Sequence, residues 1–143
     1  MSKSRYIYLV AFIATSLLPA VAHSEAMLPL QENIESGAEQ TYPLVRCAGL
    51  YLSNLEWAGD EQLGLETATK TKLTISNLIE LAIKLRSPNL GESAEESVYR
   101  DIRNISDIYL IRYEANYATT GEAWGSDAMW ESDISICRTL LGE

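Results

Sequence analysis

Side chains that could carry out chemistry are few in this 143-residue sequence. It has two cysteines, Cys47 and Cys137, and a single histidine, His23. Nucleophilic catalysis of the Ser-His-Asp or Cys-His kind needs a histidine beside the nucleophile, and the chain after His23 has none. Histidine-based zinc sites and the Glu-x-x-His sites of di-iron bundles are excluded for the same reason. No glycine-rich phosphate or dinucleotide motif occurs, so we predict no cofactor and no metal.

Carboxylates are the remaining candidates for acid–base chemistry. Asp127 and Glu131 lie one helical turn apart, and such a pair can transfer protons or hold a divalent cation. Both also fall in the first turn of a predicted helix, where acids cap free amides and match the helix dipole. Because capping already explains them, we assign no catalytic residue and lean against an enzyme. A small carboxylate-dependent enzyme acting on an envelope sugar is the alternative.

Five other side chains are candidate binding residues. Tyr109, Tyr113 and Tyr117 form a stripe at helical spacing, which could stack a sugar or an apolar ligand but more often forms the margin of a core. Trp124 lies in a glycine-flanked loop and could anchor a partner or cover the ends of the helices. Arg112 falls on a predicted buried face, where a charge needs a partner, so it forms either a structural ion pair or an anion site.

The first residues follow the pattern of a secretory signal peptide. Two cations precede an apolar run over 6–18, and an Ala-Val-Ala triplet ends at Ala22. The run is shorter than the roughly 20 apolar residues that span a bilayer, so we predict cleavage after Ala22 and no membrane span in the mature chain. We expect a periplasmic or secreted protein with a signal peptide over 1–22, a flexible lead-in over 23–41 and a single helical domain over 42–143.

Charge limits the class of partner. Acidic residues outnumber basic ones by 20 to 11, and removal of the predicted signal peptide would take away Lys3 and Arg5 as well. Such a surface repels phosphate backbones and anionic lipid head groups, so we predict no nucleic-acid partner. A cationic envelope protein is compatible with this charge but is not required by it.

Apolar residues repeat at helical spacing in four stretches separated by glycine or proline. The predicted helices are 43–57, 61–86, 93–119 and 126–141. We expect Thr41 to cap the first helix, and a Ser93-x-x-Glu96 capping box to open the third. The segment 87–91, with its proline and glycine, is predicted as a break, and Ser126 or Asp127 caps the last helix.

Four amphipathic helices with short links predict an all-α fold, most simply an up-down-up-down four-helix bundle. The alternative is a three-helix core with a short C-terminal helix laid across it. In the bundle, the antiparallel first and last helices place Cys47 beside Cys137, and both cysteines lie on apolar faces. An exported chain with two cysteines also favours pairing. We therefore predict a Cys47–Cys137 disulfide, which would remove thiol catalysis.

Three short segments carry a resemblance to other proteins. They are Arg46-Cys47, Asn116-Tyr117-Ala118-Thr119-Thr120-Gly121 and Asp133-Ile134-Ser135-Ile136-Cys137. With the signal peptide, they resemble short, uncharacterised, secreted all-helical proteins of bacteria that have one cysteine pair. The resemblance implies an exported all-helical protein and transfers no activity and no site residue.

From these observations we expect an exported, non-enzymatic binding or accessory protein of the bacterial envelope. Besides the carboxylate enzyme, the other alternative is an inhibitor or immunity protein that binds a basic partner through its acidic surface.

Overall fold

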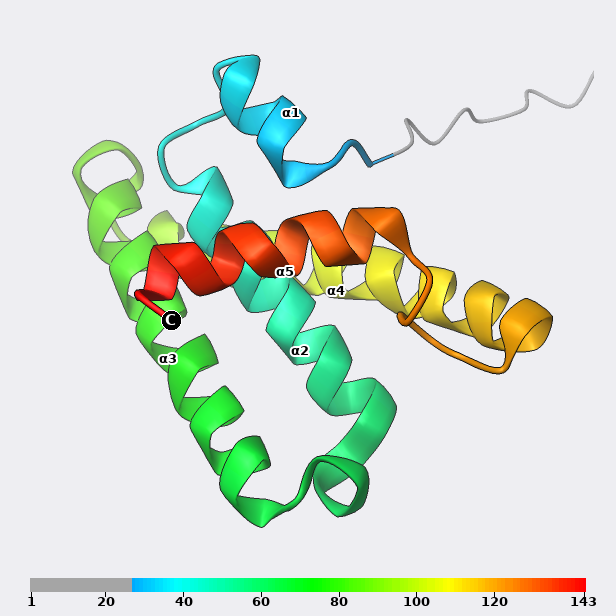
Figure 1. Cartoon of the computed structure of the whole chain (residues 1–143). Helices are drawn as coiled ribbons and strands as arrows, with labels where there is room; N and C mark the ends of the chain where they lie inside the picture. The colour runs from blue at the N-terminus through cyan, green and yellow to red at the C-terminus, as the bar shows by residue number, and fades with distance from the viewer. Residues whose placement is uncertain (1–26) are drawn as a thin grey trace, which may run out of the picture.

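A computed structural model describes residues 27–143, and within this range the chain forms helices and no strand. The predicted signal peptide over 1–22 and its cleavage site lie outside the described residues. The helices are α1 Leu30–Glu35, α2 Tyr42–Leu63, α3 Leu65–Leu90, α4 Ser93–Thr120 and α5 Ala128–Leu141 (Figure 1). The prediction of an all-α fold is confirmed.

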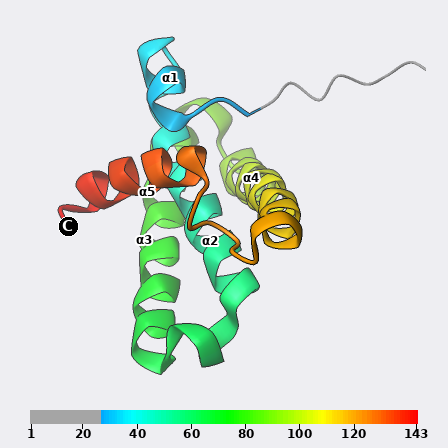
Figure 2. The same ribbon diagram turned by 45° about the vertical axis from the view of Figure 1, so that its right-hand side comes forward.

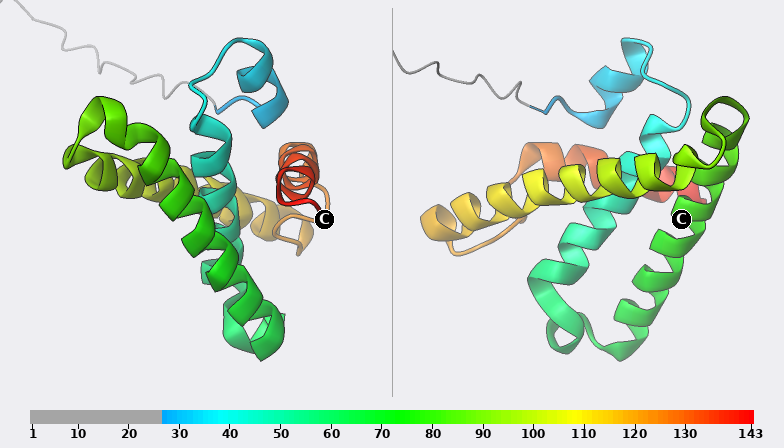
Figure 3. Two further views of the ribbon diagram at one scale, coloured as in Figure 1. Left: turned by 90° about the vertical axis from the view of Figure 1, so that its left-hand side faces the viewer. Right: turned by 180° about the vertical axis from the view of Figure 1, so that it is seen from behind.

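Helices α2, α3 and α4 pack against one another and form the centre of the molecule. Helix α5 packs against α1 and α2, and it lies across α2 rather than alongside it (Figures 1 and 2). Seen from the side and from behind, α4 and α5 pass on opposite sides of α2 (Figure 3). Of the two predicted arrangements, the three-helix core with a C-terminal helix across it matches this packing.

A glycine permits the close approach of α2 and α4. A Cβ atom on Gly49 would lie 2.5 Å from Cγ2 of Ile105 and 3.1 Å from the carbonyl oxygen of Ile102. Real Cβ atoms do not come so close to other heavy atoms, so no larger residue fits unless the two helices separate. Leu50 on α2 and Val98 on α4 are fully buried in the same hydrophobic core.

The predicted break at 87–91 is wrong in its position. Helix α3 continues through Pro88 to Leu90, and the chain turns at Gly91, whose φ is +56°. Pro88 removes one backbone donor from the last turn, but the amide of Gly91 still donates to the carbonyl of Ser87 at 2.9 Å. A proline this close to the C-terminal end interrupts too few bonds to stop the helix.

The helix starts follow the predicted caps in one of three cases. Asp127 caps α5, with its carboxylate accepting from the amides of Met129 and Trp130. The predicted capping box at Ser93 is wrong, because α4 begins at Ser93 itself, with no capping hydrogen bond from a side chain. Thr41 is at the expected position but makes no cap, because its hydroxyl instead accepts from Arg86 Nε at 3.1 Å.

Two glycines set the turn between α2 and α3. Gly59 interrupts α2 with a φ of +67°, and helical structure then resumes as far as Leu63. Gly64, with a φ of +77°, makes the actual turn into α3. The predicted start of the second helix at 61 is therefore four residues too early.

The segment before α2 differs from the predicted flexible lead-in. Residues 30–35 form α1, which packs on α5, and the Leu30 side chain is fully buried in the common core. The buried carboxylate of Asp133 on α5 accepts a hydrogen bond from the Leu30 amide, the first of α1, and so holds the segment in place.

Candidate functional site

The predicted disulfide between α2 and α5 is confirmed. Cys47 and Cys137 are bonded, their Cα atoms are 5.5 Å apart, and both residues are fully buried. The bond closes a loop with a sequence separation of 90 residues. Thiol chemistry is therefore not available at either position.

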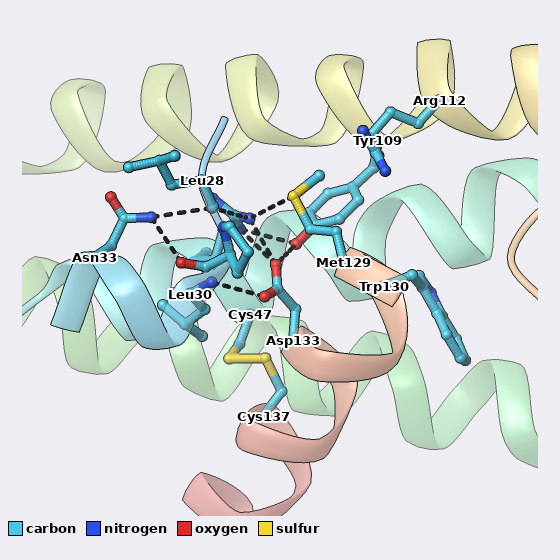
Figure 4. Close-up of polar contacts among 12 residues, drawn as sticks. Leu28, Leu30, Asn33, Cys47, Tyr109, Arg112, Met129, Trp130, Asp133 and Cys137 are labelled. Atoms are coloured by element: carbon cyan, nitrogen blue, oxygen red, sulfur yellow. Dashed lines mark hydrogen bonds and ion pairs between the residues drawn. A yellow bond between two sulfur atoms is a disulfide. The ribbon is translucent and has the colours of Figure 1, made fainter. Parts of the chain in front are cut away.

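A buried ion pair lies next to this disulfide (Figure 4). Arg46 and Asp133 have side chains with 0% exposure, and Arg46 donates to the Asp133 Oδ2 atom from Nη2 at 2.6 Å and from Nε at 3.1 Å. The Tyr109 hydroxyl donates to the same carboxylate oxygen. The backbone amide of Leu30 donates to Oδ1 at 2.7 Å, which anchors α1 on α5.

The remaining donors of Arg46 also have partners within the protein. Nη1 donates to the Tyr42 hydroxyl at 2.9 Å, and Nη2 donates to the carbonyl of Leu28 at 2.9 Å. Each nitrogen of Arg46 therefore has a hydrogen-bond partner inside the protein. A buried charge that is paired in this way is a structural element. This pair was not predicted from the sequence, although Arg46 follows the apolar Leu44-Val45 and Asp133 lies one turn before Cys137.

Arg112 forms a structural ion pair, the first of its two predicted roles. Its Nη2 and Nε atoms donate to the two carboxylate oxygens of Asp127 at 2.7 and 3.1 Å, and Asn116 donates to the same group at 2.9 Å. Burial opposes ionisation of Asp127, but the hydrogen bonds from Arg112, Asn116 and the Trp130 amide outweigh it and lower the pKa. This carboxylate is therefore already occupied, whereas Glu131 is exposed.

The tyrosine stripe is mostly core. Tyr109 and Tyr113 are fully buried, and burial raises the pKa of both hydroxyls. The Tyr113 hydroxyl donates to Asn54 Oδ1 at 2.6 Å. Tyr117 is 56% exposed and packs edge-on against Trp57. The three rings do not form one wall for a ligand.

A groove of about 270 Å³ lies where α2, α3 and α5 meet. Trp124 and Trp130 form its aromatic wall, with their rings stacked at a centroid separation of 5.8 Å and an interplanar angle of 16°. Figure 4 shows Trp130 pointing away from Asp133. The other residues that line the groove are Tyr51, Asn54, Leu63, Thr67, Lys70, Thr71, Thr74, Ile134, Arg138 and Glu143.

Polar groups of the groove are held by a short hydrogen-bond network. Asn54 Oδ1 accepts from the Tyr113 hydroxyl and from the Trp130 indole nitrogen at 3.1 Å, which fixes the orientation of the Trp130 ring. The Tyr51 hydroxyl is buried yet has no hydrogen-bond partner among residues 27–143. Burial raises the pKa of Tyr51, so this hydroxyl is a neutral donor and acceptor at physiological pH.

Of the predicted site residues, only Trp124 lies on the groove. Arg112, Tyr109 and Tyr113 belong to structural networks, and Tyr117 is on the outer surface of α4. Sequence reasoning missed Tyr51 and Arg138. The one sequence pattern that belongs to this groove is the threonine series Thr67, Thr71 and Thr74, which follows one face of α3 at i, i+4 and i+7.

Within the described range, no group of three or more metal-binding side chains comes together. None of the helices between residues 27 and 143 is long and apolar enough to cross a membrane. No protein-family model, curated protein or solved structure matches the chain.

Proposed function

We propose that this chain is an exported, non-enzymatic binding protein that holds a single sugar ring in the groove between α2, α3 and α5. The observation that carries the proposal is the Tyr51 hydroxyl, which is buried without a partner at a groove walled by Trp124 and Trp130. Folded proteins satisfy nearly all buried polar atoms, so each exception calls for an explanation. A bound ligand would supply the missing partner.

The shape and chemistry of the groove suit a sugar. Pyranose rings have an apolar face, which stacks on aromatic rings, and a polar edge, which needs hydroxyl and amide partners. The groove offers the two tryptophans for the face, and the Tyr51 hydroxyl and the α3 threonines for the edge. Its volume of about 270 Å³ is slightly below the range of ligand pockets, which runs from roughly 300 to 1,000 Å³, so a single ring fits better than an oligosaccharide.

Two further observations support export and the absence of catalysis. A buried disulfide suits an oxidising compartment such as the periplasm or the cell exterior, in agreement with the predicted signal peptide. The best-placed carboxylate of the sequence, that of Asp127, is occupied by Arg112, Asn116 and the start of α5. Its lowered pKa is the opposite of what a general acid needs.

The test is a titration with glucose and N-acetylglucosamine, followed by isothermal calorimetry and by tryptophan fluorescence. The decisive variant is Tyr51→Phe, which removes only the hydroxyl. If that hydroxyl binds the sugar, affinity should fall by about two- to tenfold, the worth of one neutral hydrogen bond. The free energy of unfolding should stay the same or rise, because an unsatisfied buried group has been removed.

Tyr99→Phe is the matched control. Tyr99 is 49% exposed on α4 and does not line the groove, so its hydroxyl should affect neither binding nor stability. The proposal is wrong if neither sugar binds the wild-type protein. It is also wrong if Tyr51→Phe and Tyr99→Phe both bind the sugar as tightly as the wild type does.

A further inference from the structure

The groove carries a local positive charge on an acidic protein. Lys70 and Arg138 line it from α3 and α5, whereas the chain as a whole has a formal net charge of −9. A carboxylate already lies between the walls, because Glu143 Oε1 is 2.9 Å from Lys70 Nζ. Both side chains remain substantially exposed, at 39% for Glu143 and 72% for Lys70.

Arg138 is unusual among the cations of the structure. Of the nine lysines and arginines between residues 27 and 143, it and Lys84 are the two that form no ion pair with an acid in that range. In a chain so rich in acids, a cation without an acidic partner at a groove is available for an anion from outside.

From these contacts we infer that the groove selects an acidic sugar, whose carboxylate replaces that of Glu143 on Lys70 and also approaches Arg138. The inference rests on the proposed function and specifies its ligand class. The Glu143 side chain then acts as an internal substitute that neutralises Lys70 while the groove is free.

Exchange of the two carboxylates is physically easy. An ion pair between exposed side chains contributes little to stability, because water screens it and both chains lose freedom in forming it. A sugar ring that stacking and the Tyr51 hydroxyl already hold in place loses little further conformational freedom when its carboxylate binds Lys70. A ligand carboxylate therefore competes well against the tethered one.

The experiment compares glucuronate with glucose, which differ in a carboxylate against a hydroxymethyl group. Calorimetry should show glucuronate binding about tenfold tighter or more, as charge-assisted hydrogen bonds predict. Lys70→Gln and Arg138→Gln should each reduce this preference. Glu143→Gln should tighten glucuronate binding by up to about fivefold, the upper range for an exposed pair.

Matched controls separate a local effect from net charge. Lys84→Gln alters the net charge as Lys70→Gln does, and Glu131→Gln alters it as Glu143→Gln does, yet neither Lys84 nor Glu131 lines the groove. Both controls should bind glucuronate like the wild type.

The outcomes distinguish the inference from the proposal beneath it. Equal binding of glucose and glucuronate overturns the acidic-sugar inference and leaves the binding function in place. A preference for glucuronate that the Lys84 variant reduces as much as the Lys70 variant also overturns the inference. Failure of both sugars to bind overturns the proposed function, and the inference with it.

Discussion

Replacing Asp133 by Asn is the most informative perturbation of this fold. The change keeps the shape of the side chain but removes its charge, and it directs amide hydrogens at the donors of Arg46. Arg46 would then be a fully buried cation without a counter-ion, because all its other acceptors are neutral. They are the Tyr42 and Tyr109 hydroxyls, the Leu28 carbonyl and the Met129 sulfur. We expect a large loss of stability without a change in the secondary structure of the folded state.

The magnitude follows from the geometry. The Asp133 carboxylate has 0% exposure and accepts two hydrogen bonds from Arg46, one from Tyr109 and one from the Leu30 amide. Breaking a buried ion pair by removing one partner costs about 3–5 kcal/mol. A domain of this size has a total stability of roughly 5–15 kcal/mol. The single substitution should therefore remove at least about a fifth of the free energy of unfolding, and most of it if the total stability lies near the lower limit.

The assay is urea unfolding followed by far-ultraviolet circular dichroism, with the disulfide intact. Lys72→Met is the comparison. The Lys72–Asp60 distance is 2.9 Å against 2.6 Å for Arg46–Asp133, but the Lys72–Asp60 side chains are about half exposed, so this substitution should cost no more than about 1 kcal/mol. The Leu30 amide should also exchange faster with deuterium in Asp133→Asn. The expectation is wrong if Asp133→Asn lowers the free energy of unfolding by no more than Lys72→Met does.

Three further predictions concern the disulfide, the helix contact and the acid side of the stability profile. Reduction of Cys47–Cys137, with a separation of 90 residues, should lower the free energy of unfolding by about 4.6 kcal/mol in the chain-entropy model. A change below about 1 kcal/mol in urea titrations with and without reductant would contradict this prediction. Gly49→Ala should lower the free energy of unfolding by about 1–3 kcal/mol through overpacking. The loss should be smaller in an Ile105→Ala background, and a double-mutant cycle measures the difference. Because the pKa of Asp127 is lowered in the folded state, the stabilisation by its carboxylate is complete above the unfolded pKa of about 4 and is lost as the pH falls through the folded pKa. In urea titrations at several pH values, Asp127→Asn should therefore be less stable than the wild type at neutral pH and lose less stability on acidification.

Local sequence signals identified the helices well, because helix propensity and apolar period act within a few residues. Asp127 at the start of α5 and the paired cysteines on apolar faces are such signals. The helix boundaries near Pro88 and Ser93 were missed because they depend on which backbone groups remain satisfied at the turn around Gly91. No periodicity in the sequence encodes that balance.

The candidate site could not be predicted in the same way, because it depends on contacts distant in sequence. Helix α1 is too short to be stable alone, and it forms where the Asp133 carboxylate, 103 residues away, accepts its first amide. Arg112 was correctly placed near a buried face, yet its partner determined that it is structural. Tyr51 became a candidate only when the packing of α2, α3 and α5 buried its hydroxyl without a partner.

The disulfide and the buried ion pair together hold α5 at two points. Arg46 and Cys47 are adjacent on α2, and their partners Asp133 and Cys137 are one turn apart on α5. A helix tethered by one bond can swivel about it, whereas a second attachment one turn away prevents that rotation. The covalent bond thus fixes where α5 lies, and the ion pair fixes which way it is turned. The orientation of Trp130 and Arg138 at the groove is therefore set by the disulfide and by the Arg46–Asp133 pair, none of whose residues line the groove.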